Sequence, residues 1–296
     1  MIRILGTIFA GLLGLAFGSF LNVCLSRWPE GESVVKPRSH CRNCDHTLAW
    51  WENVPVLSWP ALRGRCRKCG APISWRYPLV EVAVGTLWGI VGWRLFGQLE
   101  FLEVAPYPSL GLPEFGLVPA FATMLFLFIL VGIAVLDAEH FWIADRIVLP
   151  GTALGLALPI LFESLLQLPL RWHSTFWIAM GERLLGVMAA AAIILLIRWL
   201  YQLIRKREGI GLGDAKLMAM LAAWLGLPGA LLSFGIGAIL GSLTALALLA
   251  VPAARRSSET WAATKLPLGT FLCIGGIVSA LWGQPLIAAY LRWAGF

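Results

Sequence analysis

Two aspartates stand where long apolar segments meet loops, and they are the residues best suited to acid–base chemistry. Asp137 closes the apolar run 126–136, and Asp214 follows Gly211 and Gly213 directly before another apolar run. A carboxylate at membrane depth is costly in free energy unless it has a partner or a function. Two carboxyl groups, one protonated and one ionised, can hydrolyse a peptide bond, because one draws a proton from water while the other protonates the substrate. The pattern therefore predicts a catalytic pair.

Each aspartate also has a simpler explanation. Asp214 follows a glycine near the start of a helix, where aspartate is a common N-cap. Asp137 could be a terminal residue that pairs with Arg146 or stays solvated at the membrane surface. Asp145 is a second acidic candidate in the same loop as Asp137. The glycines on either side of Leu212 would let the backbone bend and approach a substrate closely, but this short pattern alone does not decide between the explanations.

Four cysteines in two CxxC pairs form the second informative pattern, and they are Cys41, Cys44, Cys66 and Cys69. Each pair can offer two thiolates to one tetrahedral metal ion, so the spacing predicts a zinc site. A full set of cysteine ligands leaves no open coordination position, which makes the predicted zinc structural. The alternatives are idle reduced thiols or a redox pair. Cys24 and Cys273 lie within apolar runs, and we expect them to be packed, inert thiols.

The composition is typical of a membrane protein. Of the 296 residues, 59% are hydrophobic and only 13% are charged, and a soluble domain of this length would need far more polar cover. The 23 Lys and Arg outnumber the 16 Asp and Glu, which gives a formal charge of +7. In a membrane protein we interpret this excess as a signal for topology and for contact with anionic lipid, and not for nucleic-acid binding.

About eight apolar segments have the length of a transmembrane helix, so the predicted fold is an all-α polytopic membrane protein with a small zinc-ribbon-like loop. The predicted spans are 4–25, 79–96, 118–136, 147–166, 176–200, 214–227, 229–251 and 267–291. The break after the sixth span depends on the turn signal in 227–229. The spacings of Gly14 with Gly18 and of Gly237 with Gly241 predict close helix packing within the chain in preference to dimerisation, and the oligomeric state stays open.

The charged loops orient these spans. Residues 27–78 are rich in Lys and Arg, whereas 98–118 contains three glutamates and no basic residue. The positive-inside rule therefore places 27–78 in the cytoplasm, and counting spans places the loops at 137–146, 205–207 and 255–256 there too. Both aspartates then lie on the cytoplasmic side. A reducing compartment also favours zinc over disulfides for the paired cysteines.

The ordered motifs together resemble the type IV prepilin peptidase family, the bifunctional leader peptidases and N-methyltransferases of the GxGD aspartyl protease class. The resemblance covers nearly the whole chain. It is carried by the two CxxC pairs and by the segments 18–23, 53–58, 73–81, 136–145, 211–217 and 266–271. One departure is Ala144, where the family often has proline between an aliphatic residue and the aspartate.

The resemblance implies a specific activity. Such enzymes cut the basic leader from prepilins or pseudopilins at the cytoplasmic face of the bacterial inner membrane. They then methylate the new N-terminal amine with S-adenosylmethionine. By resemblance, Asp137 and Asp214 are the proteolytic pair. The supporting residues would be Asp145, Gly211, Gly213 and Lys216, and the residues associated with methyl transfer would be Gly18, Asn22 and Glu81.

The same resemblance divides the chain into 1–97, with the zinc loop and the methyltransferase-associated part, and 98–296, with the peptidase part. Two other functions stay open from the residues alone. A non-enzymatic scaffold could bind a partner through its zinc loop, and an ion-coupled transporter could use the two aspartates as a cation path, although transporters place acids deeper in their spans. A basic leader would need local acids, for which the candidates are Glu30, Glu32, Glu52 and Glu139.

Overall fold

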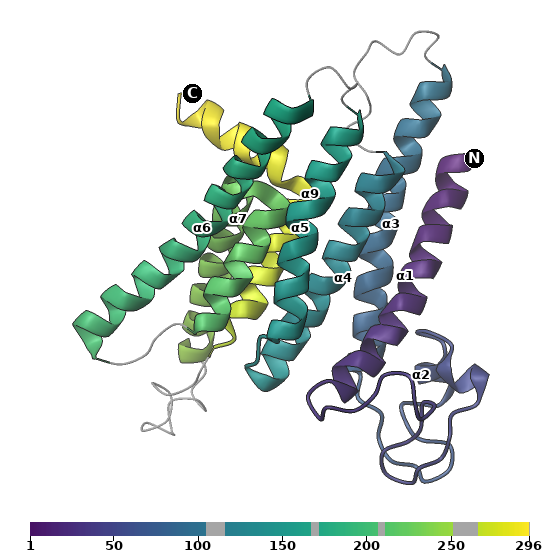
Figure 1. The fold of residues 1–296 in the computed structure, drawn as a ribbon. Helices are drawn as coiled ribbons and strands as arrows, with labels where there is room; N and C mark the ends of the chain where they lie inside the picture. Colours follow the sequence, from purple (N-terminus) through teal and green to yellow (C-terminus); the bar gives the residue numbers. More distant parts are fainter. Residues whose placement is uncertain (105–115, 167–171, 207–210, 251–265, 296) are drawn as a thin grey trace. The chain divides into compact units, whose positions relative to one another are not determined.

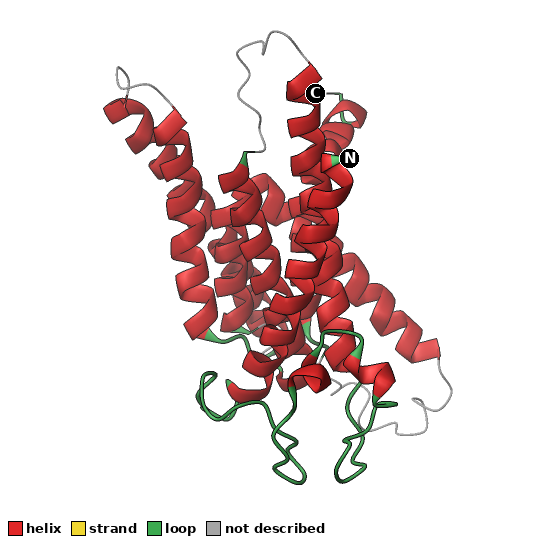
Figure 2. Cartoon of the chain, turned by 90° about the vertical axis from the view of Figure 1, so that its right-hand side faces the viewer, coloured by secondary structure: helices red, strands yellow, loops and turns green. Residues whose placement is uncertain are grey.

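The computed structural model describes residues 1–104, 116–166, 172–206, 211–250 and 266–295. Helices dominate these residues, and the cartoon in Figure 2 shows them joined by loops with no strand drawn. In chain order the elements are α1 (Ile2–Arg27), η1 (Trp50–Asn53), α2 (Ser58–Ala61), α3 (Arg76–Val104), α4 (Leu117–His140), α5 (Asp145–Leu166), α6 (Trp172–Arg205), α7 (Leu212–Ala250) and α9 (Leu268–Trp293). The predicted all-α fold is confirmed.

Six helical segments within the described residues are long and apolar enough to cross a membrane, and they make the chain a multi-pass membrane protein. They are Ile2–Arg27, Arg76–Gln98, Leu117–His140, Met180–Arg205, Leu212–Leu248 and Leu268–Trp293. The predicted number of spans, about eight, is larger than the six helical segments for two reasons. The predicted spans 214–227 and 229–251 are joined in α7, and the predicted span 147–166 is α5, in which the side chains of 159–166 lie outside the described part.

The described residues form two compact units, Met1–Gly132 and Ile133–Phe296. The first contains α1, the cysteine loop, α3 and most of α4, and the second contains the end of α4 and the helices from α5 to α9. The predicted functional division between residues 97 and 98 stays a prediction. Four predicted loops fall wholly or partly outside the described residues: most of 98–118, the start of 167–176, the last residue of 205–207, and the one with Arg255 and Arg256.

In the first unit, α1 and α3 run side by side as an antiparallel pair (Figure 1). A Cβ added to Gly14 would lie 2.9 Å from the Cα of Gly85, and one added to Gly18 would lie 2.7 Å from the Cα of Glu81. Each step of four residues forward along α1 is thus matched by an equal step back along α3. The missing side chains let the two backbones touch, as the small-residue spacing predicts.

In the second unit, glycines likewise let the backbones of α7 and α9 approach closely. A Cβ added to Gly237 would lie 3.1 Å from the backbone of Phe271, and one added to Gly275 would overlap the carbonyl of Ser233. The Ser279 hydroxyl adds a hydrogen bond of 3.0 Å to the carbonyl oxygen of Gly229. Both small-residue spacings are therefore used inside the chain, as predicted.

The helix α7 changes direction at Gly226, which has φ 70° and ψ 171°, values outside the helical range. Only glycine adopts such a conformation readily, and Pro228 follows it with no backbone N–H to continue the ladder. The break predicted at 227–229 is thus present one residue earlier. It separates the part of α7 that begins with the Asp214 turn from the part that packs on α9.

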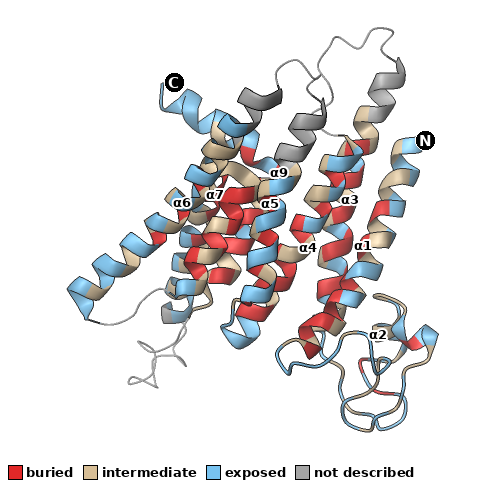
Figure 3. Ribbon diagram, in the orientation of Figure 1, coloured by how far each residue is buried: buried red, intermediate tan, exposed pale blue. Residues whose placement is uncertain are grey.

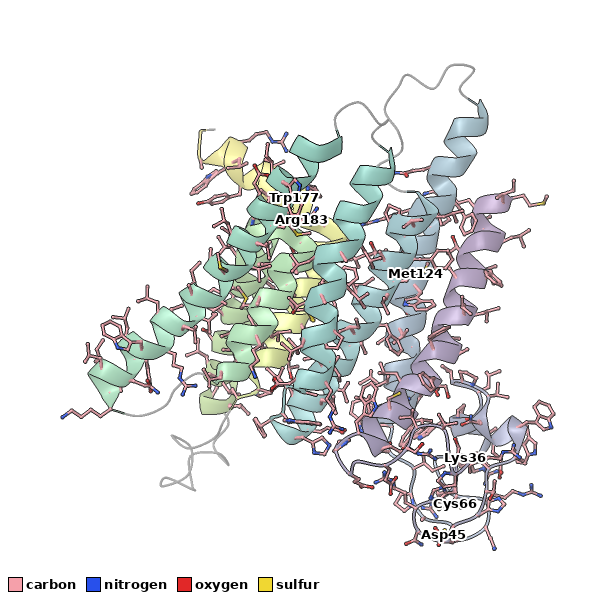
Figure 4. All side chains as sticks on the ribbon, viewed as in Figure 1. Lys36, Asp45, Cys66, Met124, Trp177 and Arg183 are labelled. Atoms are coloured by element: carbon pink, nitrogen blue, oxygen red, sulfur yellow. The ribbon has the colours of Figure 1, made fainter. Side chains whose placement is uncertain are left out.

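Exposed apolar side chains lie along α1 and α6, where the ribbon of Figure 3 shows long exposed stretches. On α1 they include Ile4, Leu5, Ile8, Phe9 and Leu12, and on α6 they include Leu185, Met188, Leu195, Leu196 and Trp199. Within a bilayer these faces meet lipid tails, and the backbone polar groups are satisfied inside each helix. Inside the first unit, the buried Trp88 donates its Nε1–H to the carbonyl of Met124, labelled in Figure 4, and so joins α3 to α4.

Candidate active site and metal centre

Asp137 lies in the last turn of α4 and is 5% exposed. Its Oδ2 accepts a hydrogen bond of 2.7 Å from the backbone N–H of Thr270 and lies 3.2 Å from the Thr270 hydroxyl. Thr270 belongs to the first turn of α9, whose own N-cap residue, Pro267, makes no side-chain cap. A carboxylate from α4 therefore binds the amide-rich start of α9, where negative charge is favoured. The alternative pairing with Arg146 is not what the structure shows.

Asp214 lies in the first turn of α7 and is 8% exposed. Its Oδ2 accepts a hydrogen bond of 3.0 Å from the backbone N–H of Gly211. This is the backward half of a capping box, in which the third helical residue satisfies the N–H before the helix. Asp214 is therefore not the N-cap that the sequence suggested, but its hydrogen bond to Gly211 fixes the carboxyl group against the turn that precedes α7.

The side chain of Ile143 lies beside Gly213, the neighbour of Asp214, and beside Gly269, which is close to Asp137. A Cβ added to Gly213 would lie 3.1 Å from Ile143 Cβ, and one added to Gly269 would lie 2.9 Å from both Ile143 Cδ1 and Asp137 Oδ2. The two carboxyl groups are close enough to interact electrostatically. The end of α4 and the starts of α7 and α9 thus meet around Ile143, and they carry the two carboxyl groups that the sequence singled out.

The turn after Asp137 forms without the proline that the resemblance led us to look for. The backbone N–H of Phe141 bonds to the carbonyl of Asp137, and Phe141 then adopts φ 51° in the left-handed region. Ala144 is buried, and its carbonyl accepts the first helical N–H groups of α5. The chain reverses at Phe141, whose left-handed backbone conformation is unfavourable for a residue with a side chain.

Asp145 and Lys216 form an ion pair in which Nζ lies 2.7 Å from Oδ1 and 2.8 Å from Oδ2. Both side chains are about half exposed. Asp145 begins α5 and Lys216 lies in the first turns of α7, so the pair joins the two helix starts beside the aspartates. The carboxylate of Asp145, the second acidic candidate, is therefore already paired with Lys216.

The cysteine loop contains two knuckles of the same construction. In the first, the Cys41 N–H bonds to the carbonyl of His46 and the Asp45 N–H to the carbonyl of Cys41. In the second, the Cys66 N–H bonds to Ala71 and the Gly70 N–H to Cys66. Asp45 and Gly70 both have a positive φ, and each knuckle is closed by one β-bridge, His40–Thr47 and Arg65–Pro72. Figure 4 labels Asp45 and Cys66, one from each knuckle.

The four sulfurs lie within 4.8 Å of one another, with Cys41 3.8 Å from Cys69 and Cys44 3.9 Å from Cys66. A zinc–sulfur distance of about 2.3 Å implies a tetrahedral edge of about 3.8 Å, so the cluster fits a zinc ion. The Ala71 N–H, with the Asn43 amide, lowers the pKa of the Cys69 thiol to about 6. The His46 N–H lowers the pKa of Cys44, but burial and the neighbouring thiols raise it to about 12. Thiols this close ionise together only beside a cation.

Buried polar contacts hold this loop in place. The carboxylate of Glu52 is buried, accepts the Ala49 N–H at 2.7 Å and lies 3.4 Å from His46 Nε2. Arg27 donates to the carbonyls of Ser33 and Pro37, both at 2.7 Å. Glu52 therefore stabilises the loop and is no longer a candidate to bind a basic leader. Glu30, another of these candidates, is paired with Arg42.

Three residues that the resemblance associated with methyl transfer lie on the contact between α1 and α3. Gly18 touches the backbone of Glu81, and Asn22 donates to the carbonyl of Tyr77 at 2.9 Å. Glu81 is 7% exposed and accepts the backbone N–H of Val56 at 2.7 Å. The Asn22 Oδ1 is buried without a hydrogen-bond partner among the described residues. The contact between α1 and α3 therefore contains one buried carboxylate, that of Glu81, and one buried acceptor without a donor in the described part of the chain, Asn22 Oδ1.

Comparison with known proteins agrees with this arrangement. The bacterial peptidase A24 N-terminal domain matches residues 12–95, and the type IV leader peptidase family matches residues 124–246. A prepilin leader peptidase/N-methyltransferase of Stutzerimonas stutzeri is 34% identical, covering 96% of this chain and 93% of the relative. The chain belongs to the type IV leader peptidase family. Proteins of the same name are 31% identical in Pseudomonas putida (97% and 94% covered) and 35% identical in Burkholderia pseudomallei strain 1026b (94% and 85%). No solved structure matches the chain.

Membership of the type IV leader peptidase family confirms the resemblance and the classification as an enzyme. The N-terminal match contains the cysteine loop and Glu81, and the second match contains both aspartates with Asp145 and Lys216. Sequence reasoning missed the contacts of Thr270, Val56 and Glu52. The only signal for Thr270 was the motif 266–271, which was noted without a role.

Proposed function

We propose that this chain removes the leader from prepilins or pseudopilins and then methylates the new N-terminal amine. The names of the relatives support the two activities, and one observation supports the chemistry. Asp137 and Asp214 are both buried and lie around Ile143 at converging helix ends. Nothing else among the described residues brings two such carboxyl groups together in the second unit.

The proposed hydrolysis uses the two aspartates as one acid–base pair. The ionised carboxylate takes a proton from water as the water oxygen attacks the scissile carbonyl carbon. The protonated partner donates its proton to the carbonyl oxygen. As the C–N bond breaks, the amine leaves with the proton that the first carboxylate took up, and a hydroxyl proton of the intermediate returns to the partner. The hydrogen bonds from Thr270 and Gly211 keep one oxygen of each carboxyl group fixed, so the pair can stay in place during these transfers.

The proposed location follows from charge and helix position. The basic loop 27–78 favours the cytoplasmic side of a bacterial inner membrane, and both aspartates are at helix ends, where a leader could reach them without crossing the bilayer. A transporter would need acids placed along its spans, whereas the two aspartates lie at helix ends. The arrangement therefore does not support a transporter. Membrane lipid would meet the exposed faces of α1 and α6.

We propose that the cysteine loop binds zinc through Cys41, Cys44, Cys66 and Cys69. When bound, the ion would join the two knuckles and offset the charge of the thiolates. Glu81 and Asn22 Oδ1 are acceptors suited to an ammonium group, such as the new N-terminus of the cleaved pilin. S-adenosylmethionine would supply the methyl group.

The test is an intact-mass assay of purified full-length protein in liposomes with a model prepilin and S-adenosylmethionine. We expect the wild type to release the leader and to yield a product heavier by one methyl group. Asp137→Asn and Asp214→Asn should give no leader-free product while keeping the wild-type unfolding temperature. A folded Asp137→Asn or Asp214→Asn variant that cleaves at the wild-type rate would exclude the proposed pair.

A further inference from the structure

Within the motif 266–271, Thr270 makes the closest polar contacts of the Asp137 carboxyl group. Thr270 is in the third position of α9, where its backbone N–H has no partner within the helix. That N–H is instead donated to Asp137 Oδ2 at 2.7 Å. The start of α9 is therefore completed by a side chain from α4, more than a hundred residues earlier in the chain.

The Thr270 hydroxyl makes a second connection to the same turn of α4. It lies 2.9 Å from the carbonyl oxygen of Ala134 and 3.2 Å from Asp137 Oδ2. Its single proton can be donated to either oxygen, so the hydroxyl links the helix backbone and the carboxyl group. A threonine whose only role was to satisfy its own helix would bond to a carbonyl one turn back, as Thr244 does with Leu240 at 2.8 Å.

Gly269 limits the position of the carboxyl group from the other side. A Cβ added there would lie 2.9 Å from Asp137 Oδ2 and 2.9 Å from Ile143 Cδ1. Only a residue without a side chain lets the carboxyl group reach the N–H of Thr270. The carboxyl group is thus held by two donors and bounded by one backbone, which is the kind of support that keeps a reactive group in one orientation.

We propose that the first turn of α9 positions Asp137 for peptide hydrolysis, with Thr270 as the positioning residue and Gly269 as the space that admits the carboxyl group. The inference rests on the proposed function of Asp137. In this role Thr270 contacts the Asp137 carboxyl group and not the peptide. It acts by fixing Oδ2, so its loss should affect the rate of the chemical step and leave substrate binding unchanged.

The test measures kcat and KM for leader removal with Thr270→Val, Thr270→Ala and Thr270→Ser, using Thr244→Val as the matched control. We expect Val and Ala to lower kcat about tenfold or more with KM within about twofold, because a hydrogen bond to a charged group is lost. Ser keeps the hydroxyl and should restore most of kcat. Thr244→Val should behave as the wild type, since its hydroxyl bonds to the carbonyl of Leu240 and not to Asp137.

Two further arms separate folding and the proposed function from this inference. Thermal unfolding reports whether each variant is folded, and Gly269→Ala should lower cleavage while staying folded, because its added Cβ would lie 2.9 Å from Asp137 Oδ2. Folded Val and Ala variants that cleave at the wild-type rate, beside an inactive Asp137→Asn, would overturn the inference alone. Cleavage by Asp137→Asn itself would overturn both this inference and the proposed pair. A Ser variant as slow as Val would overturn the role of the hydroxyl.

Discussion

At the scale of single residues, the three aspartates of the second unit have different partners. Asp137 is bound to the start of α9 and Asp214 to the turn before α7, and both are buried. Asp145 is half exposed and paired with Lys216. Burial, and not distance along the chain, separates the two candidates for acid–base chemistry from the third. One motif with two acids therefore contains one buried carboxyl group and one that is half exposed and paired with a lysine.

This difference predicts unequal effects of neutralising the acids. Asp145→Asn and Lys216→Ala should each cost less than about 1 kcal/mol of stability, because a half-exposed pair is largely screened. Cleavage should fall only a few-fold, and the double substitution Asp145→Lys with Lys216→Asp should recover part of it. Initial rates and thermal unfolding measure both effects. If Asp145→Asn alone removed all activity in a folded protein, its carboxyl group would belong to the chemistry.

At the scale of elements, most of the α-helical pattern could be predicted because apolar length is a direct requirement of the bilayer. The knuckles and the glycine contacts were also predictable, since their spacing reflects the geometry of thiolate ligation and of close helix approach. The binding of Asp137 to α9 was not predictable from spacing. A hydrogen bond between Asp137 and Thr270 depends on tertiary packing of distant helices, which leaves no periodic signal. The same holds for Glu52 and Val56.

The α1–α3 contact predicts that substituting Gly18 and substituting Gly11, both on α1, will change stability by very different amounts. Gly18→Ala should place a methyl group 2.7 Å from the Cα of Glu81, whereas at Gly11 the nearest atom is 3.6 Å away. The first substitution should destabilise the protein by about 1–3 kcal/mol, since a backbone cannot yield easily. It should also lower methylation more than cleavage. Gly11→Ala is the control, and equal effects of the two on unfolding would contradict the close approach.

The knuckles predict a metal requirement that can be measured by elemental analysis. Purified protein should contain one zinc ion per chain. Cys66→Ser should lose most of this zinc, because one of the four ligands is removed. The buried Cys24, which lies outside the cluster, provides the control Cys24→Ser, which should keep its zinc. Zinc bound equally well by Cys66→Ser would show that the four sulfurs do not form one site.

At the scale of the whole molecule, the two groups of candidate residues fall into two compact units. Gly18, Asn22, Glu81 and the cysteines lie in Met1–Gly132, and both aspartates lie in Ile133–Phe296. The family matches to 12–95 and 124–246 fall on the same two groups. Methyl transfer and cleavage should therefore be separable by substitution.

This separation predicts opposite failures in one assay. Glu81→Gln should cleave prepilin but methylate poorly, because it replaces the buried carboxylate that binds the Val56 N–H. Asp214→Asn should methylate a leader-free pilin but not cleave prepilin. Mass spectrometry of both substrates with both variants reads out all four combinations. Loss of both activities in a folded Glu81→Gln protein would show that the functions share this residue.

The measurement that tests the central claim most directly is the rate of leader removal by Asp137→Asn, by Asp214→Asn and by the double variant. We expect each single variant to lose at least about a thousandfold in kcat, and the double variant to lose no more than the worse single one, because residues that act as one unit are not additive. Cleavage by either folded single variant at a rate near that of the wild type would contradict the account. It would leave Asp137 and Asp214 as helix caps.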